Sequence, residues 1–130
     1  MGCDIHATVE KKVGDRWVMV NRLDFRSRPE AMQRNYKRFA ALAGVRGDGP
    51  DPRGLPPDIS ESTKLYADEW KADGHSHSFL ELNEAAKIFL DNEWPAKGIS
   101  DYAKKYPSEH YFSIHEAKPG EYRLVFWFDN

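Results

Sequence analysis

The chain has 130 residues, which is the size of one domain with one hydrophobic core. Hydrophobic residues make up 40% and aromatic residues 13%, which excludes a disordered chain because so much apolar area can offset the entropy lost on folding. Nineteen Lys and Arg against 21 Asp and Glu give a net charge of -2, so no strong overall field attracts nucleic acid or an anionic membrane. The single cysteine excludes a disulfide framework, and no run approaches the roughly 20 apolar residues of a membrane span.

Polar and apolar residues alternate from residue 3 to residue 10, which predicts a β-strand. One face carries Cys3, Ile5, Ala7 and Val9, and the other carries Asp4, His6, Thr8 and Glu10. A turn at 12–16 and a second strand over 17–21 complete a hairpin. We expect Cys3 to be a buried, inert thiol, because residues three apart on a strand point to opposite faces and His6 cannot act as its base.

Capping residues mark three helices. A capping sequence at Ser27 begins a helix that ends at Gly44, where a left-handed residue would stop it. Ser60 is the expected N-cap of the second helix. Ser78 and Glu81 have the spacing of a capping box, which predicts that the third helix begins after Ser78.

The segment 44–58 contains four glycines and four prolines, which excludes regular secondary structure. A loop of this length inside a compact domain is uncommon and is typically functional. Its prolines stiffen it, and it carries Arg46 and Arg53. We therefore expect this loop to contribute to a binding site.

The segments 111–116 and 122–128 flank a Pro-Gly turn, which predicts a C-terminal hairpin. Residues 124–128 are all apolar, as expected of a central strand covered on both faces. We therefore expect a single α+β domain over residues 1–130. Its N- and C-terminal hairpins would form an antiparallel sheet, with three to four helices packed on one face.

His75 and His77 give the sharpest chemical signal. Two imidazoles two residues apart in an extended segment project to the same side and can bind one metal ion. Asp4 and His6 form a second pair with the same spacing on the first strand. If the pairs meet, they would hold Zn²⁺, Mn²⁺ or Fe²⁺, whose bound water is a nucleophile near neutral pH, with Asp73 as base or supporting group. The alternative is that the two histidines lie in a polar segment that caps the start of a helix. Asp4 and His6 would then lie on a strand face that is exposed to water.

A second set of residues suits a phosphate group without a metal ion. The N-terminus of the helix expected after Ser78 offers unpaired N–H groups, and guanidinium groups can add forked donors. The residues expected to bind a phosphate-containing or nucleotide-like ligand are Arg34, Asn35, Tyr36, Arg46, Arg53 and Ser78. Arg53 would also act in catalysis, as the clamp on the anion. For each arginine taken singly, solvated surface charge is the favoured interpretation.

Several short blocks follow one another in an order that resembles a known group of proteins. They are residues 1–6 (MGCDIH), 34–36 (RNY), 52–56 (PRGLP) and 73–78 (DGHSHS). This combination is similar to a family of small proteins of tailed bacteriophages and prophages. The resemblance covers roughly the first 80 residues. It implies an accessory phage protein in the cytoplasm of the bacterial host, and it implies no particular reaction.

From these observations we expect a metal-assisted hydrolase of a phosphate-containing small molecule or nucleic acid. The alternative is a non-catalytic phage protein that sequesters a nucleotide-derived host defence signal or blocks a host protein by contact. Both expectations require that the first strand and the His75–His77 segment meet at one site.

Overall fold

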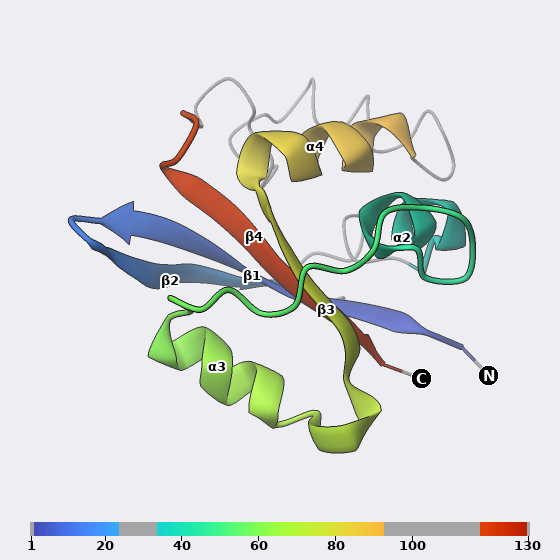
Figure 1. Cartoon of the computed structure of the whole chain (residues 1–130), viewed down its shortest axis with the longest axis horizontal. Helices are drawn as coiled ribbons and strands as arrows, with labels where there is room; N and C mark the ends of the chain where they lie inside the picture. Colours follow the sequence, from blue (N-terminus) through green and yellow to red (C-terminus); the bar gives the residue numbers. More distant parts are fainter. Residues whose placement is uncertain (1, 24–33, 93–117, 130) are drawn as a thin grey trace.

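The computed structural model describes residues 2–23, 34–92 and 118–129 of the chain (Figure 1). Regular secondary structure occupies most of these ranges. The elements are β1 (Asp4–Val13), β2 (Arg16–Leu23), α2 (Tyr36–Ala43), α3 (Glu61–Asp68), a short 3-10 helix η1 (Lys71–Asp73), β3 (His75–Glu81), α4 (Leu82–Asp91) and β4 (Tyr122–Asp129).

The four strands form one antiparallel sheet in the order β2-β1-β4-β3. Strand β4 lies between β1 and β3, so Ile5 pairs with Phe128 on one side and Leu80 pairs with Leu124 on the other. Residues 124–128 are all buried, which confirms the predicted central strand. The α+β class and the antiparallel sheet built from both terminal segments are therefore confirmed (Figure 1).

The prediction that a helix begins after Ser78 was wrong. Residues 75–81 form strand β3, and α4 begins at Leu82 after Glu81, which makes no side-chain cap bond. Pairing with β4 satisfies the backbone of this segment, so it needs no helical hydrogen bonds. The expected partner strand 111–116 and the expected cap Ser27 lie outside the described residues.

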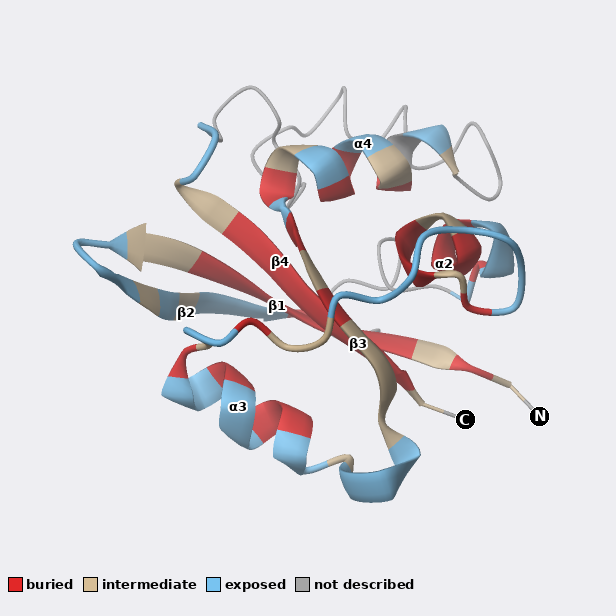
Figure 2. Cartoon of the chain, viewed as in Figure 1, coloured by how far each residue is buried: buried red, intermediate tan, exposed pale blue. Residues whose placement is uncertain are grey.

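The helices cover both faces of the sheet, and the expectation that they share one face was wrong. Helices α2 and α4 pack with Ile5, Ala7 and Phe126 in the larger core cluster. Helix α3 packs on the opposite face, where Val125 and Trp127 are buried (Figure 2). A strand that is apolar at five consecutive positions loses solvent contact on both sides only when both faces are covered.

Local signals for helix ends are confirmed where they fall in the described ranges. Gly44 has φ of 69° and ends α2, with its N–H donating to the carbonyl of Ala40. The side chain of Ser60 accepts a hydrogen bond from Thr63 N at 3.2 Å and begins α3. The irregular loop 44–58 lies between these two points and runs beside β3, because Gly54 N donates to the carbonyl of His77 at 2.8 Å.

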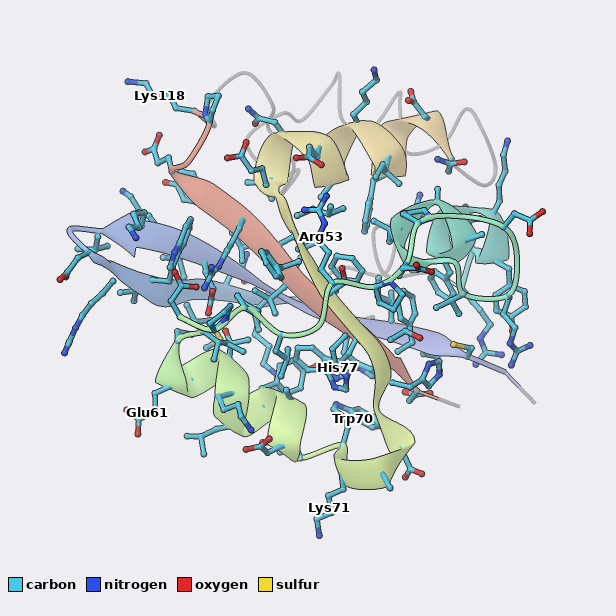
Figure 3. The ribbon with its side chains drawn as sticks, in the orientation of Figure 1. Arg53, Glu61, Trp70, Lys71, His77 and Lys118 are labelled. Atoms are coloured by element: carbon cyan, nitrogen blue, oxygen red, sulfur yellow. The ribbon has the colours of Figure 1, made fainter. Side chains whose placement is uncertain are left out.

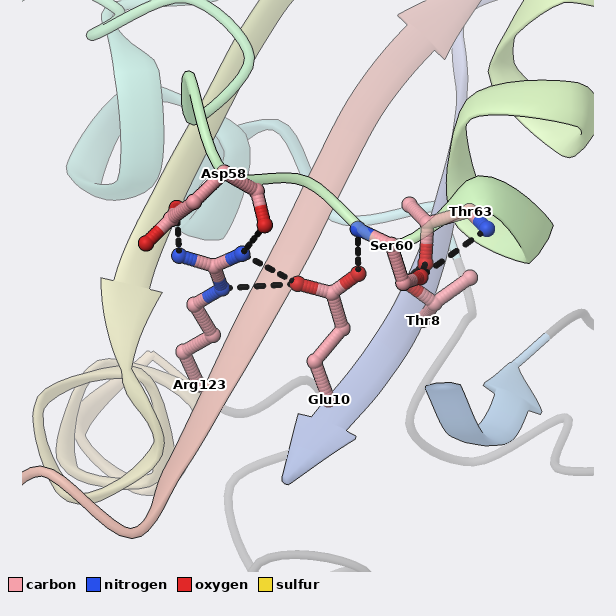
Figure 4. Close-up of polar contacts among 6 residues, drawn as sticks. All are labelled: Thr8, Glu10, Asp58, Ser60, Thr63 and Arg123. Carbon is pink, nitrogen blue, oxygen red and sulfur yellow. Dashed lines mark hydrogen bonds and ion pairs between the residues drawn. The ribbon is translucent and has the colours of Figure 1, made fainter. Parts of the chain in front are cut away.

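A polar network, buried at Glu10 and Arg123 and exposed at Asp58, joins this loop to the sheet (Figure 4). The Arg123 guanidinium donates to the carboxylates of Glu10 at 2.7 Å and Asp58 at 2.8 Å. The second oxygen of Glu10 accepts from the backbone N–H of Ser60 at 2.9 Å. Glu10 is 0% exposed, so its charge is stabilised by these donors and not by water. The hydrogen bond from Arg123 also lowers the pKa of the Asp58 carboxyl.

Candidate functional site

Strand β1 begins, and β4 ends, at the same end of the sheet (Figure 1). We call this region the terminal end. Here Nε2 of His6 lies 2.5 Å from Oδ2 of Asp129, and both side chains are mostly buried, at 7% and 16% exposure. This contact is shorter than an ordinary hydrogen bond between a nitrogen and an oxygen atom. Because the two residues lie on neighbouring strands, the sheet register holds the pair together.

Aromatic rings surround this pair. The indole of Trp70 stacks on the His6 ring with centroids 3.9 Å apart and planes 29° apart. Trp70 follows α3, and its half-buried side chain closes the α3 face beside Trp127. Figure 3 shows Trp70 next to His77. The stacking fixes the plane of the imidazole, and the Asp129 contact fixes its direction within that plane.

His6 and His77 lie on the same face, but Trp127 lies between them. The Trp127 ring centroid is 6.4 Å from that of His6 on β1 and 6.1 Å from that of His77 on β3. The three rings are nearly parallel, with interplanar angles below 30°. Strands separated by one intervening strand are about 10 Å apart. A shared metal ion would require both imidazole nitrogens to lie about 2 Å from it, and this row of rings does not bring them together.

The two histidines of β3 do not share a face. His75 pairs with Phe128 of the α2–α4 core, and His77 stacks on Trp127 of the opposite face. The pairing with β4 is irregular between His75 and Ser78, and Ser76 has φ of 55°. This bulge breaks the alternation on which the predicted His-x-His pair depended.

Asp4, the fourth predicted metal ligand, is bound by an arginine. Arg34 donates from Nε and Nη2 to the two carboxylate oxygens of Asp4 at 2.9 and 3.1 Å. This hydrogen bonding raises the pKa of Arg34. Within residues 2–23, 34–92 and 118–129, no three His, Cys, Asp or Glu side chains form a group that could hold a metal ion.

The residues predicted to bind an anion have several partners in the structure. Arg53 donates from its backbone to Ser78 Oγ at 3.0 Å and from its side chain to the carbonyl of Phe79 at 3.2 Å. Asn35 accepts from Arg38 N as the N-cap of α2. The Arg53 contacts hold the loop to β3, and the Asn35 contact caps the start of α2. Asp73, the predicted base, is exposed in η1.

Tyr36 and Arg46 meet at the terminal end. The guanidinium of Arg46 lies 5.1 Å from the centroid of the half-exposed Tyr36 ring, a cation–π arrangement. The hydroxyl of Tyr36 accepts from Cys3 N at 3.3 Å. Cys3 itself is 0% exposed, and burial raises the pKa of its thiol, which confirms the expected buried cysteine.

Three non-glycine residues of the described ranges have a strained, left-handed backbone. The non-glycine residues with positive φ in the described ranges are Arg46 at 60°, Lys71 at 48° and Ser76 at 55°. Arg46 faces Tyr36, Lys71 follows Trp70, and Ser76 lies between the two histidines of β3. A left-handed conformation costs a non-glycine residue about 1–2 kcal/mol. Such strain is typical of sites where the backbone must present particular side chains.

Burial also sets the protonation of His77. It lowers the pKa of this imidazole from its usual value near 6.5, and the neighbouring His75 lowers it further. His77 is therefore neutral at physiological pH.

The residue that sequence reasoning missed is Asp129. Its signal is weak: a single acidic residue directly after a fully apolar strand. Its importance depends on the β1–β4 register, in which Ile5 pairs with Phe128 and Asp4 with Asp129. That register is not encoded in any local pattern.

Comparisons with protein-family models, curated proteins and solved structures give no significant match for this chain. None of the helices in the described part of the chain is both long enough and apolar enough to span a bilayer.

Proposed function

We propose that this protein binds a phosphate-containing, nucleotide-like small molecule at the terminal end of the sheet. The observation that carries the proposal is the Arg46 guanidinium, which lies 5.1 Å from the centroid of the half-exposed Tyr36 ring at this end of the sheet. Arg46 also has a left-handed backbone with φ of 60°, and strain of this kind persists only where the surrounding structure holds it in place. The resemblance to phage proteins suggests that the protein encounters this ligand in the cytoplasm of a bacterial host.

The chemistry of these side chains supports a planar, anionic ligand. Tyr36 can stack on a base, and the guanidinium of Arg46 can donate two parallel hydrogen bonds to a phosphate. The metal-assisted mechanism has less support, because Asp4, His6, His75 and His77 do not converge on one point.

Thermal unfolding of the full chain with AMP, ATP or 3′,5′-cyclic AMP tests the proposal. A ligand at 100 times its dissociation constant stabilises the folded state by about 2.7 kcal/mol, which raises Tm by several degrees. We expect Tyr36→Ala and Arg46→Ala to lose this rise. Trp17→Ala, which removes an indole at the distal part of the β1–β2 hairpin, should retain it. The proposal fails if no nucleotide raises Tm, or if all variants respond like the wild type.

Analysis of the ligand recovered after incubation distinguishes sequestration from hydrolysis. A sequestering protein returns its nucleotide intact, whereas an enzyme returns a cleaved product.

A further inference from the structure

We propose that the outer edge of β2 binds an extended, acidic segment of a partner protein, which adds to the sheet as one more strand. This inference concerns a surface separate from the proposed nucleotide site. In strand addition of this kind, backbone hydrogen bonds give affinity and the side chains of the added strand give specificity.

The two edges of the sheet differ in what lies against them. Along β3, the loop 44–58 occupies the edge, because Gly54 N donates to the carbonyl of His77 at 2.8 Å and the Arg53 side chain donates to the carbonyl of Phe79 at 3.2 Å. Strand β2 is the opposite edge, and among the described residues its backbone pairs with β1 alone. Figure 2 shows most of β2 in the exposed and intermediate colours, so its outer side is open to another strand.

The pairing of β1 shows which backbone groups of β2 point outward. Lys12 N donates to the carbonyl of Glu121 at 2.8 Å, on the β4 side of β1. Hydrogen-bonded and non-hydrogen-bonded residue pairs alternate along antiparallel strands, so Lys12 makes no backbone hydrogen bond to Trp17, its partner on β2. The N–H and C=O groups of Trp17, and those of Met19 two residues later, therefore point away from β1. Both residues precede the register shift in this pairing, so they belong to the regular part of the strand.

Exposed valines lie beside these outward groups. Val13, Val18 and Val20 are 55%, 44% and 51% exposed, and all three lie in the β1–β2 hairpin. Neighbouring apolar side chains on a surface are typical of an interaction site, whereas single ones are not. An added strand with apolar side chains at alternate positions would place them beside these valines.

Charge selects among the possible occupants of this edge. Residues 11–22 contain four basic residues and one acidic residue, although the whole chain has a net charge of -2. They are Lys11, Lys12, Arg16, Arg22 and Asp15. Two β2 strands side by side would bring the basic groups close together, and charged side chains on an edge strand oppose such self-pairing. Asp or Glu side chains on the added strand would instead be attracted, which favours an acidic partner over a second copy.

The test measures the binding of synthetic peptides to the full chain by isothermal titration calorimetry. The probe alternates Glu and Val over the length of β2, which is 8 residues. One control is the same peptide with every peptide nitrogen methylated, which keeps the charge and side chains but removes the N–H donors. We expect only the unmethylated peptide to bind, with a dissociation constant that rises with salt concentration. The ¹H–¹⁵N signals of the Trp17 and Met19 amides should shift on binding.

Arg16→Glu is the decisive variant, because it changes an exposed side chain of β2 and removes no buried contact. It replaces attraction by repulsion, so it should raise the dissociation constant of the Glu–Val peptide by at least about tenfold. Lys87→Glu makes the same change of charge at an exposed position of α4 and is the matched control. It should leave the dissociation constant within about twofold of the wild-type value, because salt screens charges that lie far from the peptide.

The inference is overturned if the Glu–Val peptide does not bind, if its methylated form binds equally well, or if Arg16→Glu retains wild-type affinity. Dimerisation of the chain that shifts the same two amide signals without peptide would assign the edge to a second copy and also overturn it. Tighter binding of single-stranded oligothymidylate than of the peptide, lost in Arg16→Glu, would assign the hairpin to nucleic acid instead.

Discussion

Nε2 of His6 lies 2.5 Å from Oδ2 of Asp129, although 123 positions of sequence separate the two residues. The contact joins the beginning of β1 to the end of β4. Because an ionised carboxylate only accepts hydrogen bonds, the contact favours the tautomer of His6 with hydrogen on Nε2. It is therefore a side-chain link between two central strands.

We expect His6 to be the Nε2–H tautomer in its neutral form. Long-range ¹H–¹⁵N correlation spectra of the imidazole distinguish the two tautomers directly. In Asp129→Asn the amide can donate as well as accept, so the fixed preference should be lost and the Nδ1–H form should appear. An Nδ1–H signal for His6 in the wild-type chain would contradict the assignment of Nε2 as the hydrogen-bond donor to Asp129.

Breaking the buried ion pair between Glu10 and Arg123 should destabilise the fold strongly. Arg123→Met leaves the Glu10 carboxylate buried without its cation, which costs about 3–5 kcal/mol of the free energy of unfolding. Urea denaturation monitored by Trp fluorescence measures this loss. The double variant Glu10→Leu with Arg123→Met removes both charges and should lose less than the sum of the single changes. Additivity within about 0.5 kcal/mol would show that the two side chains are not coupled.

Acidification should destabilise the protein partly through His77. Burial lowers the pKa of this group below its usual value near 6.5, so the unfolded chain binds a proton more readily than the folded chain. The free energy of unfolding therefore falls as pH decreases below about 6.5, and this contribution levels off once pH has passed the lowered folded value. His77→Gln should lose less stability than the wild type over the same pH range, as measured by urea denaturation at stepped pH. Equal losses in both proteins would contradict this assignment.

Gly49 permits a close approach between the loop and α2. A Cβ atom at this position would lie 1.7 Å from the carbonyl oxygen of Ala40. Gly49→Ala should therefore displace the loop and lower the free energy of unfolding by about 1–3 kcal/mol. Asp51→Ala, an exposed change in the same loop, should stay within about 0.5 kcal/mol of the wild type. A Gly49→Ala variant as stable as Asp51→Ala would show that the loop does not press against the helix.

Strong local patterns predicted much of the fold. Alternation identified the strand that contains His6, continuous apolarity identified the central strand β4, and the caps Gly44 and Ser60 identified two helix ends. Each of these signals depends on neighbours within a few residues. They could therefore be interpreted without knowledge of the tertiary structure.

The candidate site could not be predicted in the same way. The left-handed backbone at Ser76 turns His75 and His77 to opposite faces, and a serine in the sequence does not predict that conformation. The polar face of β1 is buried under α3 because Trp70 and Tyr66 cover it, and not because of its own composition. Asp129 becomes important only through its strand register. These are long-range contacts, which a single sequence does not specify.

The position of β4 has a consequence for synthesis. Among the described elements, this strand leaves the ribosome last, yet it joins β1 to β3 and buries side chains on both faces. A nascent chain that lacks it has two separated parts of a sheet, with apolar surfaces exposed. The sheet can therefore be completed only after the final described strand has been synthesised, and non-local strand pairing of this kind is slow. Premature termination within residues 122–129 should give an aggregating fragment, not a smaller folded domain.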